Sequence, residues 1–450
     1  MTRMSRTFAL MFLVMLTVAA ANTALQSVLP ALGRSLGVRD QAVAAAFSAS
    51  ALLWVLAAPF WANRSDRYGR RAMILLGVGG LITSLTVCGA FLLAGINGAI
   101  SGAAAFVLFI FGRLIYGSLG AAAPPAVQAL VADATSREER TRALTLLASA
   151  FGLGTILGPA VAPYLILGSV RGVTIGLAGP AFIFAGFGVG VWLTVRAALP
   201  DDRRASRSGG PDDRRASRSG GPDDRRATRE GAGAQSAYPS IGGAPTGASV
   251  RAATGAKGEA VGFLDPRIRG WMIAGLVMGH AQAMTSQAIG FLVIDRLHVA
   301  PAAALEPTGI VLMMGAGASL LAQWGIIPLL NLNPRQLVLS GLVIAAAGCA
   351  LTGLAGSLYG IATAYALASL GFGFTRPGYT AGASLAVGAA AQGSVAGKVT
   401  SVNGASFVLG PSIGVALYEA QHSLPYLTAG AACAVMIGYA WAALREPCQG

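Results

Sequence analysis

Two arginines, Arg113 and Arg376, stand inside long stretches that otherwise contain no charged residue. An arginine near the centre of a bilayer costs about 2.5 to 3.5 kcal/mol on insertion scales, so such a residue normally faces a protein interior or a wet cavity. The planar guanidinium donates hydrogen bonds in a fork that matches a carboxylate, phosphate or sulfonate. We expect both arginines to approach a central cavity and bind negative charge there. The alternative is that Arg113 serves only a local sequence motif and that Arg376 only stabilises the helix break before Pro377.

Other polar side chains in these stretches are spaced three, four or seven residues apart, which places them on shared helix faces. Hydrogen bonds between helices explain such residues as well as contact with a bound molecule does. His280 is the side chain among them that normally titrates near neutral pH. The candidate cavity residues are Asn22, Gln26, Arg113, Tyr116, His280, Gln287, Arg376 and Tyr379.

Acidic residues are absent from the apolar stretches; Asp133, Asp295 and Glu419 stand only at their ends. The chain has three histidines and no evident pair of nucleophile and base, so we expect no enzymatic activity. Its four cysteines are scattered, which predicts neither a disulfide framework nor a metal site. We expect no cofactor.

The elements that position these residues are membrane-spanning helices. Of the 450 residues 54% are hydrophobic and only 11% are charged, whereas soluble domains carry about 25% charged residues. A charge-free stretch of roughly 20 residues can cross the hydrocarbon core of a bilayer. Such stretches predict an all-α membrane protein with spans at 8–30, 41–61, 72–94, 102–131, 143–167, 178–195, 270–292, 308–330, 336–355, 358–388, 399–418 and 425–444.

The net charge of +14 reflects membrane topology. With the N-terminus in the cytoplasm, most of the 32 Lys and Arg residues fall on the cytoplasmic side, as the positive-inside rule requires. We therefore expect a multi-pass protein of the inner (cytoplasmic) membrane with both termini in the cytoplasm. The bilayer is the expected partner, and nucleic acid is not.

The chain divides into two membrane halves, 1–198 and 263–450, joined by a linker at 199–262. The linker is rich in Arg, Asp, Gly and Ser, which predicts disorder. It contains an eleven-residue segment from Pro200, repeated from Pro211 and again imperfectly from Pro222. We interpret the repeats as duplication of a flexible cytoplasmic connection.

The two halves are related by an offset of 252 residues, which aligns Pro125 with Pro377 and Gly158-Pro159 with Gly410-Pro411. Six spans in each half give both copies the same orientation. Such repeats are related by a pseudo-two-fold axis along the membrane normal, and the binding site lies between them. The pattern favours a protein that exposes a central cavity alternately to the two sides.

The loop between the second and third spans resembles the signature loop of the major facilitator superfamily, Gly-x-Leu-(Ala or Ser)-Asp-Arg-x-Gly-Arg-(Arg or Lys)-x-x-(Leu or Ile). Gly69 permits a positive backbone torsion there, and Asp66 can cap a helix or pair with an arginine. The resemblance implies that the loop controls conformational exchange. The chain departs from the pattern at Ala62 and Arg64 and matches it at Ser65, Asp66, Arg67, Gly69, Arg70, Arg71 and Ile74.

Two further segments resemble elements of the same superfamily. Arg113 and Gly117 match the Arg-x-x-x-Gly element of the fourth span. Gly154, Gly158 and Pro159 are similar to the Gly-x-x-x-Gly-Pro element of drug and proton antiporters, although Ala162-Pro163 replaces its final glycine pair. Small residues at this spacing also serve ordinary helix packing.

The resemblance implies two six-helix bundles that carry small organic molecules by alternating access, as in twelve-span drug exporters. A coupling proton or an exchanged ion would be the second partner, and we expect a monomer. Proton-coupled drug exporters usually present a carboxylate within the membrane, which this chain lacks. The alternative is therefore a carrier of organic anions or metabolites, by uptake or exchange, without proton coupling through a buried carboxylate.

Overall fold

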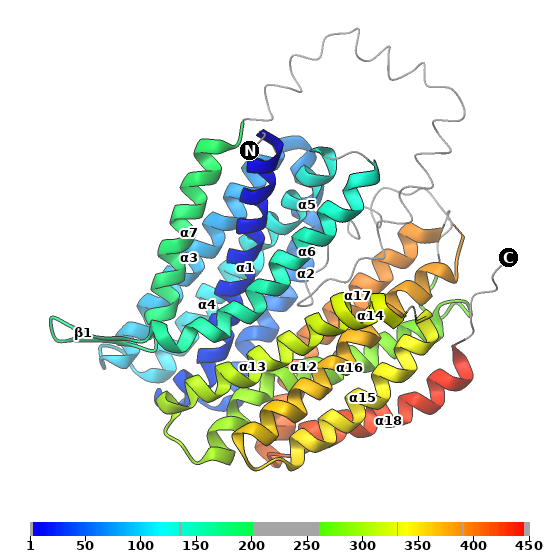
Figure 1. The fold of residues 1–450 in the computed structure, drawn as a ribbon. Coiled ribbons are helices and arrows are strands. Elements are labelled where there is room, and N and C mark those ends of the chain that lie inside the picture. The colour runs from blue at the N-terminus through cyan, green and yellow to red at the C-terminus, as the bar shows by residue number, and fades with distance from the viewer. Residues whose placement is uncertain (1–2, 135–136, 201–260, 331, 389–390, 445–450) are drawn as a thin grey trace, which may run out of the picture.

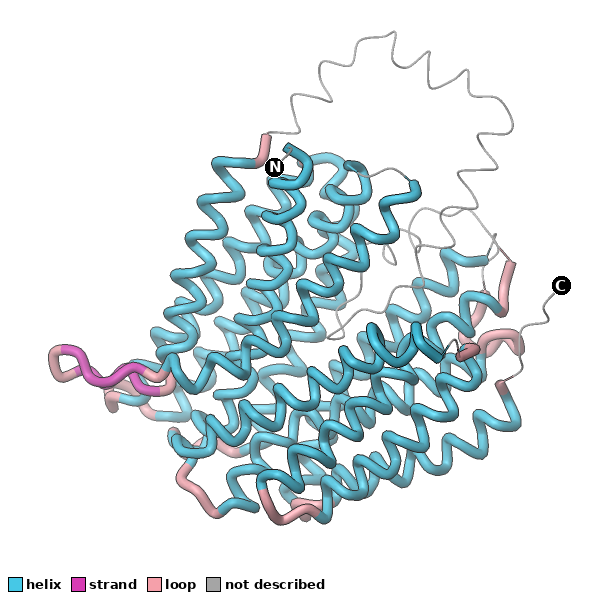
Figure 2. The backbone as a smooth tube through the Cα atoms, viewed as in Figure 1, coloured by secondary structure: helices cyan, strands magenta, loops and turns pink. Residues whose placement is uncertain are grey.

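The structure is a computed structural model that describes residues 3–134, 137–200, 261–330, 332–388 and 391–444 (Figure 1). Helices make up almost all of it, and the strands of the described residues form a single hairpin (Figure 2). The apolar stretches become helices because a chain in lipid must satisfy its backbone N–H and C=O groups within the segment itself. The fold is an all-α membrane protein with twelve transmembrane helices in two six-helix bundles.

The first half contains six spans, of which the fourth is bent. Its elements are α1 (Arg3–Ser35), α2 (Asp40–Tyr68), α3 (Arg70–Ile96), α4 (Gly102–Leu119), a 3-10 turn (Gly120–Ala122), α5 (Ala123–Ala134), α6 (Arg137–Val161), a second 3-10 turn (Ala162–Leu165), β1 (Leu167–Val170), β2 (Val173–Gly176) and α7 (Gly179–Ala198).

The second half also contains six spans, and its second span is the irregular one. Its elements are α12 (Arg269–Leu297), a 3-10 turn (Pro301–Ala304), α13 (Leu305–Leu320), a π-helical turn (Leu321–Ile326), α14 (Ile327–Leu330), α15 (Pro334–Leu354), α16 (Leu358–Leu385), α17 (Gln392–Ala420) and α18 (Leu424–Ala443).

Ten described segments are long and apolar enough to cross a membrane. The other two predicted spans correspond to α6, whose apolar part is the shorter Ser149–Leu165, and to α12, which carries polar side chains along its length. The fourth span bends between α4 and α5 just before Pro124 and Pro125. Proline removes a backbone donor and disturbs the preceding turn, so a break at this point follows from the sequence.

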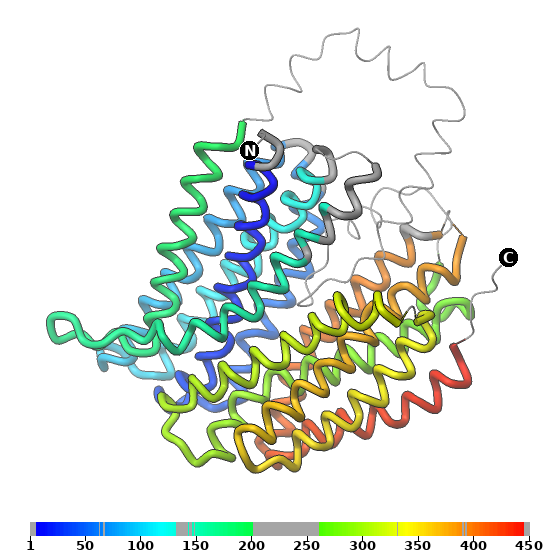
Figure 3. The backbone as a smooth tube through the Cα atoms, viewed as in Figure 1, coloured from blue at the N-terminus to red at the C-terminus, as the bar shows by residue number. Residues whose placement is uncertain are grey.

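The two halves are consecutive in the chain and lie beside each other (Figure 3). We call the end of the molecule where α1 ends and α2 begins the Arg34 end, and the end where α2 turns into α3 the Gly69 end. At the Arg34 end α1 contacts α12, and α2 contacts α17. The predicted linker 199–262 lies almost entirely outside the described residues, so the division into domains stays a prediction.

A β-hairpin that was not expected from the sequence connects α6 to α7. Its two-residue turn is Arg171-Gly172, with φ angles of 52° and 84°. The second strand of the hairpin is held by the side chain of Asn97, which exchanges two hydrogen bonds of 2.8 Å with the backbone of Thr174. Figure 1 shows the hairpin projecting sideways from the ends of α3 and α7.

Before α12, the chain turns around Asp265. Hydrogen bonds from the side chain and the backbone N–H of Arg267 lower the pKa of the Asp265 carboxyl to about 2. This exposed pair lies in the turn that leads into the first helix of the second half.

Candidate functional site: a cavity between the two halves

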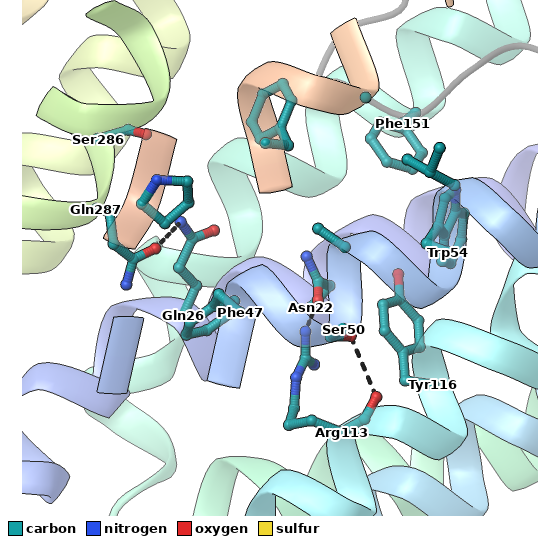
Figure 4. Close-up of a pocket in the computed structure, with 15 residues that line it drawn as sticks. Asn22, Gln26, Phe47, Ser50, Trp54, Arg113, Tyr116, Phe151, Ser286 and Gln287 are labelled. Carbon is teal, nitrogen blue, oxygen red and sulfur yellow. Dashed lines mark hydrogen bonds between the residues drawn. The ribbon is translucent and has the colours of Figure 1, made fainter. Parts of the chain in front are cut away.

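A cavity of about 140 Å³ lies between the two halves (Figure 4). Helices α1, α2, α4 and α6 contribute from the first half, and α12 and α17 contribute from the second. The lining residues are Asn22, Gln26, Phe47, Ser50, Ala51, Trp54, Val55, Arg113, Tyr116, Phe151, Ser286, Gln287, Gly404, Phe407 and Pro411.

Arg113 is the charged residue of this wall, and its side chain is only 3% exposed. Its Nη2 donates a hydrogen bond of 3.0 Å to Oδ1 of Asn22 (Figure 4). The guanidinium carbon lies 4.9 Å from the ring centroid of Phe47 and 5.0 Å from that of Tyr116, within cation–π range. Among the described residues its Nε has no hydrogen-bond partner. The charge is held by an amide and two aromatic rings, all of them neutral.

Arg113 is positioned by contacts of its own backbone. Ser50 of α2 donates a hydrogen bond of 3.1 Å to the carbonyl oxygen of Arg113. Gly117, one turn further along α4, lies against α2 so closely that a Cβ atom there would be 2.5 Å from the carbonyl oxygen of Ser50. The glycine of the fourth-span motif therefore allows the approach that places the arginine in the cavity.

Aromatic rings form much of the remaining wall. The rings of Trp54 and Tyr116 lie 5.1 Å apart at a tilt of 41°. Phe151 from α6 and Phe407 from α17 line the cavity as well, so rings reach it from both halves. A planar apolar molecule could stack against these faces.

Two amides span the two halves. Nε2 of Gln26 on α1 lies 3.5 Å from Oε1 of Gln287 on α12, a long hydrogen bond (Figure 4). Both side chains line the cavity.

The structure brings five of the eight candidate cavity residues to this wall: Asn22, Gln26, Arg113, Tyr116 and Gln287. His280 lies elsewhere on α12. Its Nδ1 is 2.8 Å from the carbonyl oxygen of Leu276 and 3.3 Å from Oγ of Ser406. Tyr379 is buried and donates a hydrogen bond of 2.6 Å to Oδ1 of Asn403.

Arg376 is buried but is not among the described residues of the cavity wall. Its guanidinium carbon lies 5.7 Å from the ring centroid of Phe407, which itself lines the cavity. The repeat offset of 252 explains the difference, because it aligns Arg113 with Tyr365 and not with Arg376. Arg376 stands about three helical turns further along the equivalent span, and Arg113 is the arginine among the described lining residues.

A cluster of charged residues that the sequence did not single out joins the halves at the Arg34 end. We call Arg34, Asp40, Asp295 and Tyr418 the Arg34 cluster. Arg34 of α1 forms a two-bond ion pair with Asp40 of α2, at 2.7 and 3.1 Å. It forms a second two-bond ion pair with Asp295 of α12, of which the Nη2–Oδ2 contact is 2.8 Å. The hydroxyl of Tyr418 on α17 also donates to Asp295.

Further contacts between the halves surround this cluster. Nε2 of His422 lies 3.7 Å from the Asp295 carboxylate. The backbone N–H of Gln41 donates to Glu419 at 2.8 Å, and the hydroxyls of Ser48 and Ser412 are 2.9 Å apart. These contacts join the two halves at the Arg34 end.

Arg34 and Asp295 are 261 positions apart in the chain, and so are Gln26 and Gln287. The equal separations indicate that α1 and α12 run side by side in the same direction. The available signal in the sequence was the pair of polar residues, eight positions apart, on the first helix of each half.

The signature loop lies at the Gly69 end. Gly69 has a φ of 91° and joins α2 to α3 without an intervening loop. Arg70 donates a hydrogen bond of 3.0 Å to Oγ of Ser65, and Arg71 donates one of 2.5 Å to the carbonyl oxygen of Arg196 in the last turn of α7. The side chains of Asp66 and Arg67 lie outside the described part of the structure, so the gating role of the loop stays a prediction.

The fifth-span motif packs against α1. A Cβ atom on Gly154 would lie 2.5 Å from the carbonyl oxygen of Leu16 and 2.7 Å from Cβ of Ala19. Gly158 approaches Ala20 and Thr23 in the same way, and Pro159 lies within α6. The motif thus holds α6 directly on the helix that carries Asn22 and Gln26. In the described residues no group of three or more His, Cys, Asp or Glu side chains is placed to hold a metal ion.

Known proteins resemble the chain in sequence over short segments. It is 34% identical over 118 residues to multidrug resistance protein 2 of Bacillus subtilis (strain 168), and 36% identical over 111 residues to the class B tetracycline resistance protein of Escherichia coli. These segments cover 26% and 25% of this chain, and 26% and 24% of the two relatives. The matches thus span about a quarter of each curated relative.

Solved structures resemble the chain over almost its whole length. The human organic anion transporter MFSD10 (TETRAN) superposes with a TM-score of 0.60 at 19% identity, covering 98% of this chain and all of that one. The xylose transporter XylE from E. coli, in a partially occluded inward-open conformation, gives 0.67 at 14% identity, covering 100% and 99%. At such identities the likeness establishes the fold alone.

The family profile shows which family the chain belongs to, because the match extends over both halves. The profile of the Major Facilitator Superfamily matches residues 11–411, which include α1, the signature loop, the cavity and most of the second half. The chain belongs to the major facilitator superfamily of membrane transporters.

Proposed function

We propose that this protein is a secondary transporter that exports small organic molecules by alternating access. The observation that carries the proposal is the cavity between the two halves, whose Arg34 end is closed by ion pairs that join those halves. Tilting the halves apart would break these contacts and expose the cavity at that end. Closing them again would return it to the state seen here.

Export is supported by two relatives whose names refer to drug resistance, multidrug resistance protein 2 and the class B tetracycline resistance protein. The matched segments are short, so the direction is part of the proposal. The Gly154-x-x-x-Gly158-Pro159 segment, which resembles the antiporter element, points the same way.

The proposed site of action is the cytoplasmic membrane, with the Arg34 end outside and the Gly69 end in the cytoplasm. The distribution of Lys and Arg supports this orientation, because the signature loop and the linker together carry 15 of the 32, 4 and 11 respectively. We propose that the protein acts as a monomeric transporter and catalyses no chemical conversion. A proton or an exchanged ion is the proposed driving partner.

A transport assay tests this function. Export appears as uptake in energised inverted membrane vesicles. Vesicles that contain this protein should accumulate at least one compound of a panel of lipophilic anions, neutral molecules and cations. Asp66→Asn should slow this uptake strongly and leave equilibrium binding of the same compound within a few-fold. Absence of uptake throughout the panel, or binding that collapses while turnover per bound molecule stays normal, would contradict the proposal.

A further inference from the structure

We propose that the cavity selects a planar, largely aromatic molecule with one negative charge, and that Arg113 receives the charged group. The inference rests on the proposed transport function and names the class of substrate. It starts from the imbalance of charge in the cavity wall. Arg113 supplies one positive charge, and no Asp or Glu is among the described lining residues.

The guanidinium retains capacity to bind an anion. It has five N–H groups, and among the described residues it makes a single hydrogen bond, to Asn22. Its buried Nε has no partner there. A buried polar group normally has its hydrogen-bonding capacity filled, because water has been removed from it. A carboxylate or sulfonate at this place would accept from the fork and neutralise the charge.

The rest of the wall fits a flat apolar body. Rings of Phe47 and Tyr116 pack beside the guanidinium, while Trp54, Phe151 and Phe407 line the cavity as well. Aromatic partners gain from stacked or edge-to-face arrangements with such rings. Ser50, Gln26, Ser286 and Gln287 add neutral polar groups that tolerate a second polar substituent.

A cation is disfavoured by the same arrangement. It would enter a wall that already holds one buried positive charge and offers no carboxylate among the described residues. Like charges repel more strongly in a site of low dielectric constant than in water. Two of the lining rings that could attract a cation, Phe47 and Tyr116, already contact Arg113.

Three probes of one shape test the inference: naphthalene-2-carboxylate, naphthalene-2-carboxamide and 2-naphthylmethylammonium. The full-length purified protein is titrated with each, and thermal stabilisation gives the affinity by mass action. The carboxylate should bind about tenfold or more tightly than the amide, as a charge-assisted pair does. The ammonium compound should bind least.

Arg113→Gln should abolish the preference for the carboxylate, and Arg113→Lys should restore only part of it because the fork is lost. Arg376→Gln is the matched control, a buried arginine away from the described wall that should leave the preference intact. Each variant is compared with its own unliganded melting temperature, so lost stability does not imitate lost binding.

The inference is overturned if the amide or the ammonium compound binds as well as the carboxylate, if none of the three binds, or if the preference survives Arg113→Gln. The vesicle assay separates the two proposals. Uptake of neutral or cationic compounds alone would support the transport function and contradict the selection of anions. A carboxylate preference without uptake of any compound would support the anion-binding site and contradict the transport function.

A second inference rests on a different feature, the hairpin β1–β2. We infer that it lies in the headgroup layer of the bilayer with one face toward the lipid chains. Val170 pairs with Val173, and Ser169 pairs with Thr174. Paired residues share a face and neighbours alternate. Val170, Val173 and Ile175 therefore form an apolar face. The opposite face carries Ser169 and Thr174, whose hydroxyls are 3.1 Å apart, with Leu167 further from the tip.

The position of the hairpin indicates that lipid is what contacts its apolar face. It connects two membrane-spanning helices and projects sideways from them (Figure 1). Val170 is 58% exposed, and apolar side chains such as Phe187 and Leu193 are exposed on the neighbouring helix α7. Tyr164, just before the hairpin, is 77% exposed, as aromatic residues at the level of the headgroups often are. Arg171 at the tip is exposed and complements lipid phosphate.

Site-specific fluorescence tests this placement in phosphatidylcholine proteoliposomes. Val170→Cys and Ser169→Cys are made in a Cys448→Ser chain, in which the described cysteines Cys88, Cys349 and Cys433 are buried. A bimane at 170 should be quenched by a nitroxide near the top of a lipid chain, and one at 169 by aqueous iodide. Equal quenching of both by iodide, or of neither by the nitroxide, would overturn the inference.

Discussion

Arg113 and Asn22 set the charge of the cavity at the scale of single residues. The arginine is positive and its hydrogen-bonding partner is a neutral amide, at 3.0 Å. A carboxylate in place of that amide would form an ion pair with Arg113 inside the protein. The internal carboxylate, and not the charged group of the substrate, would then neutralise Arg113.

Asn22→Asp is therefore expected to weaken binding of naphthalene-2-carboxylate by about tenfold or more, since an internal carboxylate removes the unpaired charge. Binding of 2-naphthylmethylammonium should increase relative to the carboxylate. The measurement is the same thermal titration, and Asn22→Gln, which keeps the amide, is the control. An unchanged order of the three probes in Asn22→Asp would show that Arg113 does not determine charge selection.

The sequence predicted which residues share a helix face, but not which face meets the cavity. Asn22 and Gln26, four residues apart, lie on one face of α1, and both line the described wall. His280 and Tyr379 have the same kind of spacing and point to neighbouring helices, because helix rotation depends on packing between spans. The contact between Arg34 and Asp295 was not predicted, since it depends on two helices that are distant in the chain.

At the scale of elements, small residues determine how closely the helices of the first half approach. Gly154 and Gly158 hold α6 on α1, and Gly117 holds α4 on α2. The spans themselves were predictable from charge-free length. The search by charge-free length does not find the hairpin or the break between α4 and α5, because it ignores local turns. Pro124 and Pro125 are the sequence signal for that break.

Gly154→Ala should destabilise the protein, because its new Cβ would lie 2.5 Å from the Leu16 carbonyl oxygen and force α6 away from α1. Overpacking of this kind typically costs about 1 to 3 kcal/mol. Thermal unfolding in detergent measures the change. Gly186→Ala in α7, where nothing lies within 4 Å of the new methyl group, is the matched control and should keep the wild-type melting temperature or raise it. Equal effects of the two substitutions would contradict this account of the packing.

At the scale of the whole molecule, the Arg34 cluster holds the two halves together at one end. Arg34 has a partner in each half, Asp40 in its own and Asp295 in the other. Loss of the arginine would leave Asp295 without its cationic partner from the first half. The state seen here should then lose stability relative to the state that is open at the Arg34 end.

Arg34→Gln is expected to shift this equilibrium by about tenfold toward opening, which corresponds to roughly 1.4 kcal/mol. A Ser412→Cys reporter on α17, beside Ser48 of α2, should then react correspondingly faster with an impermeant maleimide added outside. Arg39→Gln is the control, because Arg39 is exposed at the same end and forms no described ion pair. Unchanged labelling in Arg34→Gln would show that the cluster does not hold this end closed.

The repeats of the linker lie outside the described residues, and their sequence lacks an apolar pattern. Excision of residues 200–221, which removes two copies, should leave expression and vesicle uptake unchanged. Uptake that falls despite normal membrane levels would reveal a regulatory or partner-binding role for the repeats.

Two polar contacts between α1 and α12 lie at different distances from the Arg34 end, and this determines the order in which they break. Gln26 precedes Arg34 by about two helical turns, roughly 12 Å, and Gln287 precedes Asp295 by the same length. When two rods tilt apart about a pivot, their tips separate before their middles do. The ion pair at the helix ends must therefore break first, and the amide pair beside the cavity must break last. The contacts thus break in order toward the bound molecule, and they re-form in the reverse order when the two halves close.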